Sequence, residues 1–462
     1  MTERELLART AALAADYLET LDTRQIRPER GYREMHELFD RAVPDRPADP
    51  ADVVEELAAV GEQGVMAIGS GRWYGFVAGG AVPSSLAADW LVSAWDQNTG
   101  LAEPTPATSA LEAVTGRWVL ELLGLPPDSS FAFVTGCQMA HVTCLAAARH
   151  SVYRRAGWDL PQRGLAGAPP LRVVLGGKRH VTIKRALRLL GIGESQEVVL
   201  PADSEGRMAT EQLGAALDGS TPTIVCAQAG EVNTGAFDSL PEIADACEAT
   251  GAWLHVDGAF GIWAAVSPRL RHLVAGLERA DSWTTDAHKW LNVPYDSGIV
   301  LCRHPASHRA AMTTAAAYLI QDAGAQRVRD EVDWVPEFSR RARGFSVYAA
   351  LRSLGRNGLV ELVERCCDGA ARFGQRIVQL EGVELLNEVV LNQVLFRFES
   401  DERTDEVLAR VQESGRIWLS GTTWDGLKAI RVSVSNWQTG DEEIDLAVEA
   451  FREAYAGKLP AR

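Results

Sequence analysis

The residues most able to do chemistry are a lysine and an aspartate that each follow an apolar segment. Lys289 comes after the strand-like run 281–287, and Asp257 closes the strand-like run 252–256. Pyridoxal phosphate (PLP) requires such a pair, because a lysine amine forms a Schiff base with its aldehyde and an acid partners its pyridine nitrogen. A surface lysine is disfavoured by the apolar surroundings of Lys289, whereas an aspartate before glycine also fits a helix N-cap. The pair predicts a PLP site.

Strand-like and helix-like segments alternate over residues 110–305 and position these two side chains. Such alternation implies βαβ units and a mainly parallel sheet covered by helices, which is an α/β fold. Asp257 then lies at the carboxyl end of a strand, where ligands bind in open α/β sheets, and its burial requires a cationic partner. The predicted strands are Phe131–Val134, Arg172–Leu175, Glu197–Leu200, Thr223–Ala227, Trp253–Val256, Ser282–Thr285 and Gly298–Cys302, and the predicted helices are Leu111–Leu123, Met139–Arg155, Val181–Leu190 and Leu240–Thr250.

Four segments are expected along the chain. Residues 1–70 are predicted to form an N-terminal helical arm, and residues 71–305 a large PLP-binding α/β domain. Residues 306–344 form a connection, and residues 345–462 a small C-terminal α+β domain. The elements predicted in this last domain are helices over 345–379 and 441–456 and strands near 383–398 and 428–436.

The composition is that of an ordinary globular protein. The 462 residues are 46% hydrophobic and 23% charged, with a net charge of −16, which argues against a nucleic-acid or anionic-membrane surface. No apolar run approaches the roughly 20 residues that span a bilayer, and the charged N-terminus lacks a signal-peptide pattern. The seven cysteines show no paired spacing, so we expect reduced thiols in a cytoplasmic protein, without a disulfide framework or a metal site.

Two motifs carry a family resemblance. His255-Val256-Asp257-Gly258-Ala259-Phe260 and Asp286-Ala287-His288-Lys289-Trp290 resemble segments of the group II PLP-dependent decarboxylases, which act on aromatic amino acids, tyrosine and glutamate. The resemblance extends over about residues 65–440. It implies the PLP-dependent transferase fold of aspartate aminotransferase (fold type I), PLP as cofactor, and a homodimer with active sites at the subunit interface.

The resemblance also implies roles around the cofactor ring. Lys289 is the Schiff-base lysine, and His288 reaches the cofactor phosphate. Asp257 partners the pyridine nitrogen, and Ala259 is small enough to let the ring lie flat. His180 matches the histidine that stacks on the ring, although a histidine at the start of a helix is more often a cap or a surface residue.

The turn 135–141 follows a strand and opens a helix, where backbone amides bind phosphate. Gly136, Cys137 and Gln138 are therefore the predicted phosphate-binding residues. The family usually has serine or threonine here, followed by Glu-Ala-Asn. This chain has Cys137, Gln138, Met139 and His141 in that stretch, and the sequence assigns no role to His141.

Two further segments resemble parts of the family's cofactor site. Asn233 lies in a segment that resembles the loop under the cofactor, where a polar side chain meets the ring oxygen. Glu231 departs from the usual threonine or asparagine, and it either acts near the cofactor or points to solvent. Ser339, within 338–341, matches a segment that reaches the phosphate of the neighbouring subunit; the alternative is a solvated basic patch. No role follows for Lys178 or Arg179.

The substrate side of the site is the least defined. Trp73, Phe76 and Ala78 correspond to the wall of the substrate pocket, and Ala78 replaces a threonine that touches the substrate carboxylate in the aromatic decarboxylases. Tyr318 resembles the mobile-loop tyrosine that protonates Cα after CO₂ leaves, a role suited to a phenol in a site that excludes water. A surface tyrosine is the alternative. Related aldehyde synthases carry phenylalanine at this position.

The predicted reaction is decarboxylation of an L-amino acid, with aromatic amino acids among the candidates, to the corresponding amine. Other PLP outcomes on the same scaffold remain open: aldehyde synthesis by oxidative deamination, transamination, or Cα–Cβ cleavage. A degenerate PLP-fold binding subunit is the non-enzymatic alternative. Retention of Asp257, His288 and Lys289 together argues against it.

Overall fold

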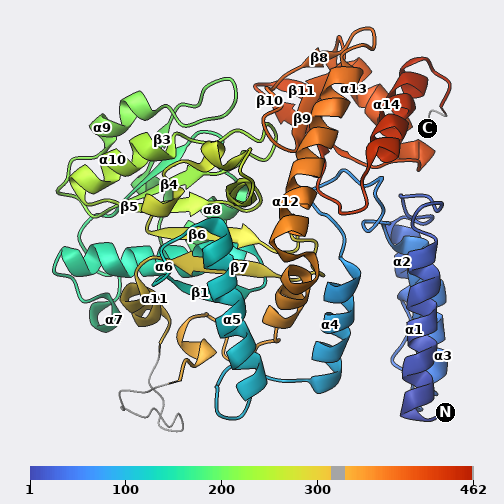
Figure 1. The fold of residues 1–462 in the computed structure, drawn as a ribbon, viewed down its shortest axis with the longest axis horizontal. Coiled ribbons are helices and arrows are strands. Elements are labelled where there is room, and N and C mark those ends of the chain that lie inside the picture. Colours follow the sequence, from blue (N-terminus) through green and yellow to red (C-terminus); the bar gives the residue numbers. More distant parts are fainter. Residues whose placement is uncertain (314–327, 460–462) are drawn as a thin grey trace. The chain divides into compact units, whose positions relative to one another are not determined.

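The computed structural model describes residues 1–313 and 328–459 and divides the chain into two compact units (Figure 1). Unit 1 comprises Met1–Gly80, Arg372–Leu385 and Leu395–Arg462, and unit 2 comprises Ala81–Ala371 and Leu386–Val394. The four-segment division expected from the sequence stays a prediction. Within the described residues, no helix is both long and apolar enough to cross a membrane.

Unit 2 contains a seven-stranded sheet in the order β1-β7-β6-β5-β4-β2-β3. Strand β7 is antiparallel to both of its neighbours, and the pairs among the remaining strands are parallel. The predicted mainly parallel α/β sheet is therefore confirmed. The strands are β1 (Ser130–Val134), β2 (Arg172–Gly176), β3 (Glu197–Leu200), β4 (Thr223–Gln228), β5 (Trp253–Asp257), β6 (Ser282–Asp286) and β7 (Gly298–Cys302).

Every residue of β1, β4, β5, β6 and β7 is buried, as expected for a sheet covered by helices. Helices α6 and α8 share one apolar core with β2, β4 and β5, and α10 packs against β4 and β5. The helices that begin in unit 2 are α4 (Pro83–Trp95), α5 (Pro106–Leu123), α6 (Cys137–Arg155), α7 (Leu160–Arg163), α8 (Val181–Leu189), α9 (Leu213–Ala216), α10 (Leu240–Thr250), α11 (Pro305–Met312) and α12 (Gly344–Ile377).

The register brings polar residues together at one edge of the sheet. Asp257, the last residue of β5, is paired with Gln228 on β4 and with Thr284 on β6. Strand β6 continues two residues beyond Thr284 and ends at Asp286. Because these strands are parallel, their carboxyl ends meet, and the two carboxylates lie on neighbouring strands at the same edge.

Unit 1 combines N-terminal helices with a four-stranded sheet in the order β10-β11-β9-β8. The sequence predicted α14, β8, β9 and β11 but neither α13 nor β10. Both have sequence signals: Ser400 caps α13, and Asp425-Gly426 form the turn between β10 and β11. The elements are α1 (Glu3–Glu19), α2 (Tyr32–Phe39), α3 (Pro50–Gly61), α13 (Asp401–Ser414), α14 (Asp441–Tyr455), β8 (Glu384–Leu385), β9 (Gln393–Arg397), β10 (Ser420–Trp424) and β11 (Leu427–Ser433).

Candidate functional site

A cavity of about 310 Å³ lies in unit 2, among the carboxyl ends of β4, β5 and β6 and the starts of α6 and α8. Residues from five separate stretches of the sequence converge on it, which is how open α/β sheets build ligand sites. The lining residues are Thr135, Gly136, Cys137, Gln138, His180, Thr182, Gln228, Gly230, Val232, Asp257, Ala259, Phe260, Asp286, His288 and Lys289.

Lys289 presents its amine to this cavity three residues after the end of β6. Its Nζ lies 3.0 Å from Oδ2 of Asp286. Burial opposes the charged amine, but the carboxylates of Asp286 and Asp257 outweigh it and raise the pKa of Lys289 from 10.5 to about 12. The amine is therefore held as an ammonium ion in the protein without cofactor.

Asp286 is a site residue for which the sequence analysis assigned no role. Its Oδ1 accepts a hydrogen bond of 2.6 Å from the backbone N–H of Cys137, the first residue of α6. Burial alone would raise the pKa of Asp286, but Lys289, His288 and this N–H hold it below its ordinary value. The strand-end argument applied to Asp257 would also have found Asp286, because it closes the next strand.

Asp257 faces the same cavity from the end of β5 and is 5% exposed. Its Oδ1 accepts the N–H of Ala259 at 3.1 Å, and its Oδ2 lies 3.4 Å from Nε2 of His141. Burial would raise the pKa of Asp257, but His141, His180 and Lys289 together lower it well below its ordinary value. The side chain is therefore a buried carboxylate, the group that a protonated pyridine nitrogen needs as a partner.

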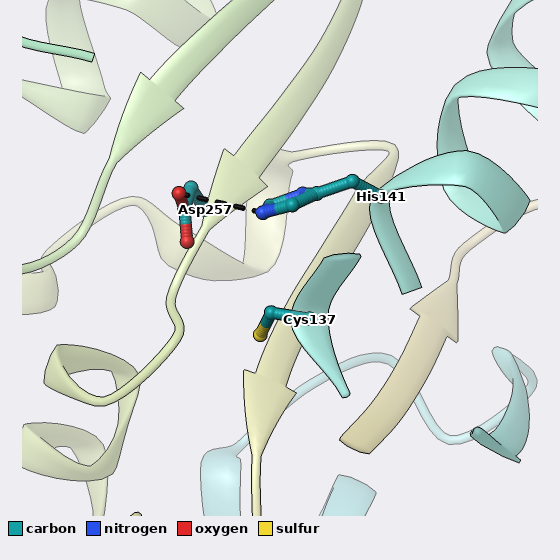
Figure 2. A group of neighbouring side chains, drawn as sticks. All are labelled: Cys137, His141 and Asp257. Carbon is teal, nitrogen blue, oxygen red and sulfur yellow. Dashed lines mark ion pairs between the residues drawn. The ribbon is translucent and has the colours of Figure 1, made fainter. Parts of the chain in front are cut away.

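His141, which does not line the cavity, lies behind Asp257 (Figure 2). It points from α6 toward the carboxylate, and Cys137 lies one turn earlier on the same helix. One ligand atom from each of Cys137, His141 and Asp257 falls within 4.8 Å of the others. Such a set could hold a metal ion, although the sequence predicts no metal site.

His180 is a helix cap, as one of the sequence alternatives had it, and its stacking on the cofactor ring stays a prediction. It is the N-cap of α8, where its Nδ1 lies 2.8 Å from Oγ1 and 3.4 Å from the backbone N of Thr182. Its side chain also lines the cavity. His288 lines the cavity too, and its Nδ1 accepts the N–H of Ser297 at 3.0 Å, so its proton is on Nε2.

Two glycines allow the turn before α6 to approach the sheet. A Cβ on Gly298 would lie 2.4 Å from Cα of Gly136. A Cβ on Gly136 would meet His288 at 3.2 Å and Asp286 at 3.3 Å. Only residues without a side chain leave this space open beside the N-terminus of α6, where a phosphate is stabilised. Of the predicted phosphate-binding residues, Gly136, Cys137 and Gln138 all line the cavity.

Two predicted residues of unit 2 do not line the cavity. The amide of Asn233 instead donates to Glu231 at 3.0 Å. Glu231 is 3% exposed and also accepts the backbone N–H groups of Asn233 and Thr234, so it orders the 231–234 turn and does not point to solvent. Ser339 is exposed, whereas its neighbour Arg340 is buried in an ion pair with Glu112 at 2.9 Å. The alternative of a solvated basic patch is therefore wrong for Arg340.

Four predicted residues belong to other parts of the chain. Trp73, Phe76 and Ala78 lie in unit 1, where Trp73 stacks on Trp418 with ring centroids 4.5 Å apart. Their role as a substrate wall stays a prediction. Tyr318 lies outside the described residues.

Comparison with known proteins agrees with this geometry. Residues 33–399 match the pyridoxal-dependent decarboxylase conserved domain, which is most of the chain. The chain belongs to this decarboxylase family. It is accordingly a PLP-dependent carboxy-lyase that acts on amino acids, as the two motifs predicted. The arrangement of Lys289 and Asp257 fits the cofactor of that family, with an amine and a buried carboxylate on one cavity.

The proteins that this chain resembles are named for different reactions. The chain is 29% identical to L-2,4-diaminobutyrate decarboxylase of Rhizobium meliloti (strain 1021), over 81% of this chain and 75% of the relative. It is 26% identical to phenylacetaldehyde synthase of Arabidopsis thaliana, over 95% and 93% of the two chains. A solved structure of Oryza sativa TDC with PLP and tryptamine has the same fold, with a TM-score of 0.92, 22% identity and 99% and 98% coverage.

Proposed function

We propose that this decarboxylase converts an L-amino acid into its amine and CO₂ with Lys289 and Asp257 as the two residues that hold PLP. The observation that carries the proposal is their placement. They lie at the ends of neighbouring parallel strands and face one cavity of about 310 Å³. Bound PLP supplies an electron sink for the electrons that departing CO₂ leaves behind.

Lys289 anchors the cofactor, and Asp286 controls its proton. Nζ can bond to carbon only after it loses the proton that the adjacent carboxylates retain. Oδ2 of Asp286 lies 3.0 Å from Nζ and fixes the amine's direction into the cavity. Asp286 therefore sets both the position and the protonation of the lysine.

The other cavity residues would orient the cofactor. Asp257 would hold a proton on the pyridine nitrogen, and Ala259 would leave room for a flat ring. His180 would cover the ring from the start of α8. His288, with its proton on Nε2, and the turn of Gly136, Cys137 and Gln138 line the same cavity and would contact the phosphate.

Protonation of Cα and the substrate wall involve residues beyond this cavity. We assign the proton donor to Tyr318, and the substrate wall to Trp73, Phe76 and Ala78. Asn233 and Ser339 complete the cofactor site; Ser339 reaches the phosphate of a second subunit. The protein then works as a cytoplasmic homodimer with shared active sites. Support comes from the family's motifs and from the net charge of −16, which suits a protein without nucleic-acid or membrane partners.

The experiment is a product analysis on purified holoenzyme. It is incubated with a panel of aromatic, acidic and basic L-amino acids, and amine, aldehyde and CO₂ are resolved by mass spectrometry. We expect stoichiometric amine and CO₂ from one substrate class. In parallel, borohydride reduction and peptide mapping locate the cofactor, and an adduct on any lysine other than Lys289 would contradict the assignment.

Aldehyde synthesis is the second candidate, and the 26% identity with phenylacetaldehyde synthase keeps it open. Tyr318 favours decarboxylation, because a phenol can return a proton to Cα. We expect Tyr318→Phe to divert product from amine to aldehyde, with ammonia and peroxide. An unchanged amine yield without either by-product would exclude Tyr318 as the donor.

A further inference from the structure

Asp257 is connected to the interior of unit 2 by a chain of polar side chains. His141 approaches Asp257 with Nε2, and its Nδ1 lies 3.0 Å from Nε2 of His255. Nδ1 of His255 lies 2.9 Å from Oγ of Ser282, which also accepts the indole N–H of Trp253 at 2.9 Å. All four side chains behind Asp257 are at most 1% exposed.

The acceptor at one end of this chain determines where the protons of two neutral rings lie. An ionised carboxylate accepts only, so a neutral His141 carries its proton on Nε2, the nitrogen that faces Asp257. Nδ1 of His141 then accepts from Nε2 of His255, and Nδ1 of His255 is left as an acceptor. Ser282 can donate its hydroxyl proton to that nitrogen, because the indole N–H of Trp253 occupies only one of its lone pairs.

We propose that His141 is a positioning residue that presents a fixed, neutral Nε2–H to Asp257, and that His255, Ser282 and Trp253 impose this tautomer. The proposal rests on the proposed role of Asp257 as partner of the pyridine nitrogen. It assigns a role to the histidine that replaces the family's usual asparagine at position 141.

A neutral donor serves Asp257 better than a cation would. A lysine or arginine at this place would neutralise the carboxylate, as Lys289 does for Asp286. His141 instead orients the carboxylate and leaves its negative charge for the cofactor. Burial lowers the pKa of His255 to about 3, so His255 stores no second proton. Oγ1 of Thr284 lies 3.4 Å from Nδ1 of His141, and its hydroxyl can donate to that nitrogen when it is unprotonated.

The proposal also excludes metal binding by the same three residues in the holoenzyme. A metal ion would need the lone pair of Nε2 on His141, which a proton occupies in the proposed tautomer. The tautomer of His141 therefore separates the two interpretations of the cluster drawn in Figure 2.

The first test observes the protons directly. Holoenzyme labelled with ¹⁵N in its histidines is studied by long-range ¹H–¹⁵N correlation NMR, and signals are assigned by their loss in His141→Asn and His255→Asn. We expect neutral rings protonated on Nε2 for both residues. A ring of His141 protonated on Nδ1 or on both nitrogens would overturn the proposal, as would one metal ion per subunit in elemental analysis.

The second test measures cofactor retention. His141→Phe should bind PLP about 10-fold more weakly in equilibrium dialysis, since it keeps a ring but removes the N–H that faces a buried carboxylate. Ser282→Ala should weaken binding by less and should let the tautomer of His141 vary in the NMR spectrum. Unchanged PLP affinity in His141→Phe, or an unchanged tautomer in Ser282→Ala, would contradict the proposal.

A matched control distinguishes loss of the polar chain behind Asp257 from general loss of core packing. His308→Phe replaces another fully buried histidine of unit 2, which bonds Ser130 and Trp334 instead of Asp257. We expect it to leave PLP affinity unchanged, and a loss equal to that of His141→Phe would show a structural effect only. Borohydride mapping of wild-type Lys289 tests the PLP site itself, so failure of the role proposed for His141 and failure of the proposed function give different results.

Discussion

The ends of β5 and β6 carry two buried carboxylates with opposite surroundings. Asp286 closes β6 and has a cation of the protein, Lys289, at 3.0 Å and a backbone N–H at 2.6 Å. Asp257 closes β5, and its nearest ionisable neighbour is a histidine at 3.4 Å. Both have a pKa below the ordinary value although burial opposes this.

The comparison separates a carboxylate that is neutralised by the protein from one that is prepared for a ligand. Desolvation of a carboxylate costs several kcal/mol unless a partner offsets it. Asp286 obtains that offset from the chain itself and works on Lys289. Asp257 has longer contacts, with the N–H of Ala259 at 3.1 Å and with His141 at 3.4 Å, and on our proposal it gains its full partner when a pyridinium binds. Each of the following changes tests one side of this comparison.

Lys289→Ala should have the largest effect, because it removes the anchor of the cofactor and the cation of Asp286 together. We expect activity to fall on the order of 10⁴-fold or more. The absorbance band of lysine-bound PLP should disappear, and borohydride should fix no cofactor to the chain. A variant that keeps a borohydride-stable adduct would show that another lysine carries PLP.

Asp257→Asn should have the second largest effect, since an amide cannot balance the charge of a positive pyridine nitrogen. Loss of one partner of a buried pair costs roughly 3–5 kcal/mol, which corresponds to about 10²- to 10⁴-fold in kcat/KM. The readout is kcat/KM together with borohydride mapping, which should still find PLP on Lys289. Retention of more than a tenth of the activity would mean that Asp257 and Asp286 have been assigned the wrong way round.

Asp286→Asn should act mainly through the pKa of Lys289. Loss of the nearest carboxylate should lower that pKa by about one unit from about 12, so the amine reacts with PLP at lower pH. The rate of PLP capture by the apoprotein as a function of pH measures this shift. The amide can still accept the N–H of Cys137, so the fold of the turn should persist. An unshifted profile would contradict control of the lysine by Asp286.

The same variant makes a prediction for stability. The pKa of Asp286 is lowered from 3.8 and that of Lys289 is raised from 10.5, so the pair stabilises the folded apoprotein between these two values. Its contribution is lost as the pH falls below 3.8 through the lowered pKa of Asp286. It is also lost as the pH rises above 10.5 toward 12. Urea unfolding of wild type and variant should differ most at neutral pH and converge outside this window.

Cys137→Ser should have the smallest effect, about twofold or less in kcat/KM. The contact with Asp286 comes from the backbone N–H of Cys137 and not from its thiol, so a hydroxyl preserves it. A loss of activity much greater than this would indicate that the thiol itself is used. Steady-state kinetics with wild type as the reference is sufficient.

The sheet was predictable from the sequence strand by strand. Most strands of unit 2 are short, largely apolar runs with helical segments between them, and burial on both faces of β4, β5 and β7 leaves few alternatives. The hairpin of β10 and β11 was missed because β10, Ser420–Trp424, is polar and partly exposed. Its turn signal lies in two residues only, Asp425-Gly426.

The residues of the site that follow strand ends could be predicted from the sequence. The hydrogen bonds between its side chains could not. Lys289, Asp257, His288 and the turn after β1 follow from a strand-end rule and short motifs. The resemblance places Asn233 beside the cofactor, and that role stays a prediction; the structure adds the hydrogen bond from its amide to the neighbouring Glu231. That bond depends on how the 231–234 turn closes, which a residue pattern does not encode.

By itself the sequence determined the cofactor, the family and the lysine–aspartate pair, because these depend on residue type and position along strands. Only the tertiary structure decided what supports each carboxylate. The contacts of Asp286 with Cys137 and of Asp257 with His141 join residues 149 and 116 positions apart. They form because the parallel register sets the ends of β5 and β6 beside each other and because α6 starts at that edge. Such long-range geometry comes from packing, and local sequence patterns do not specify it.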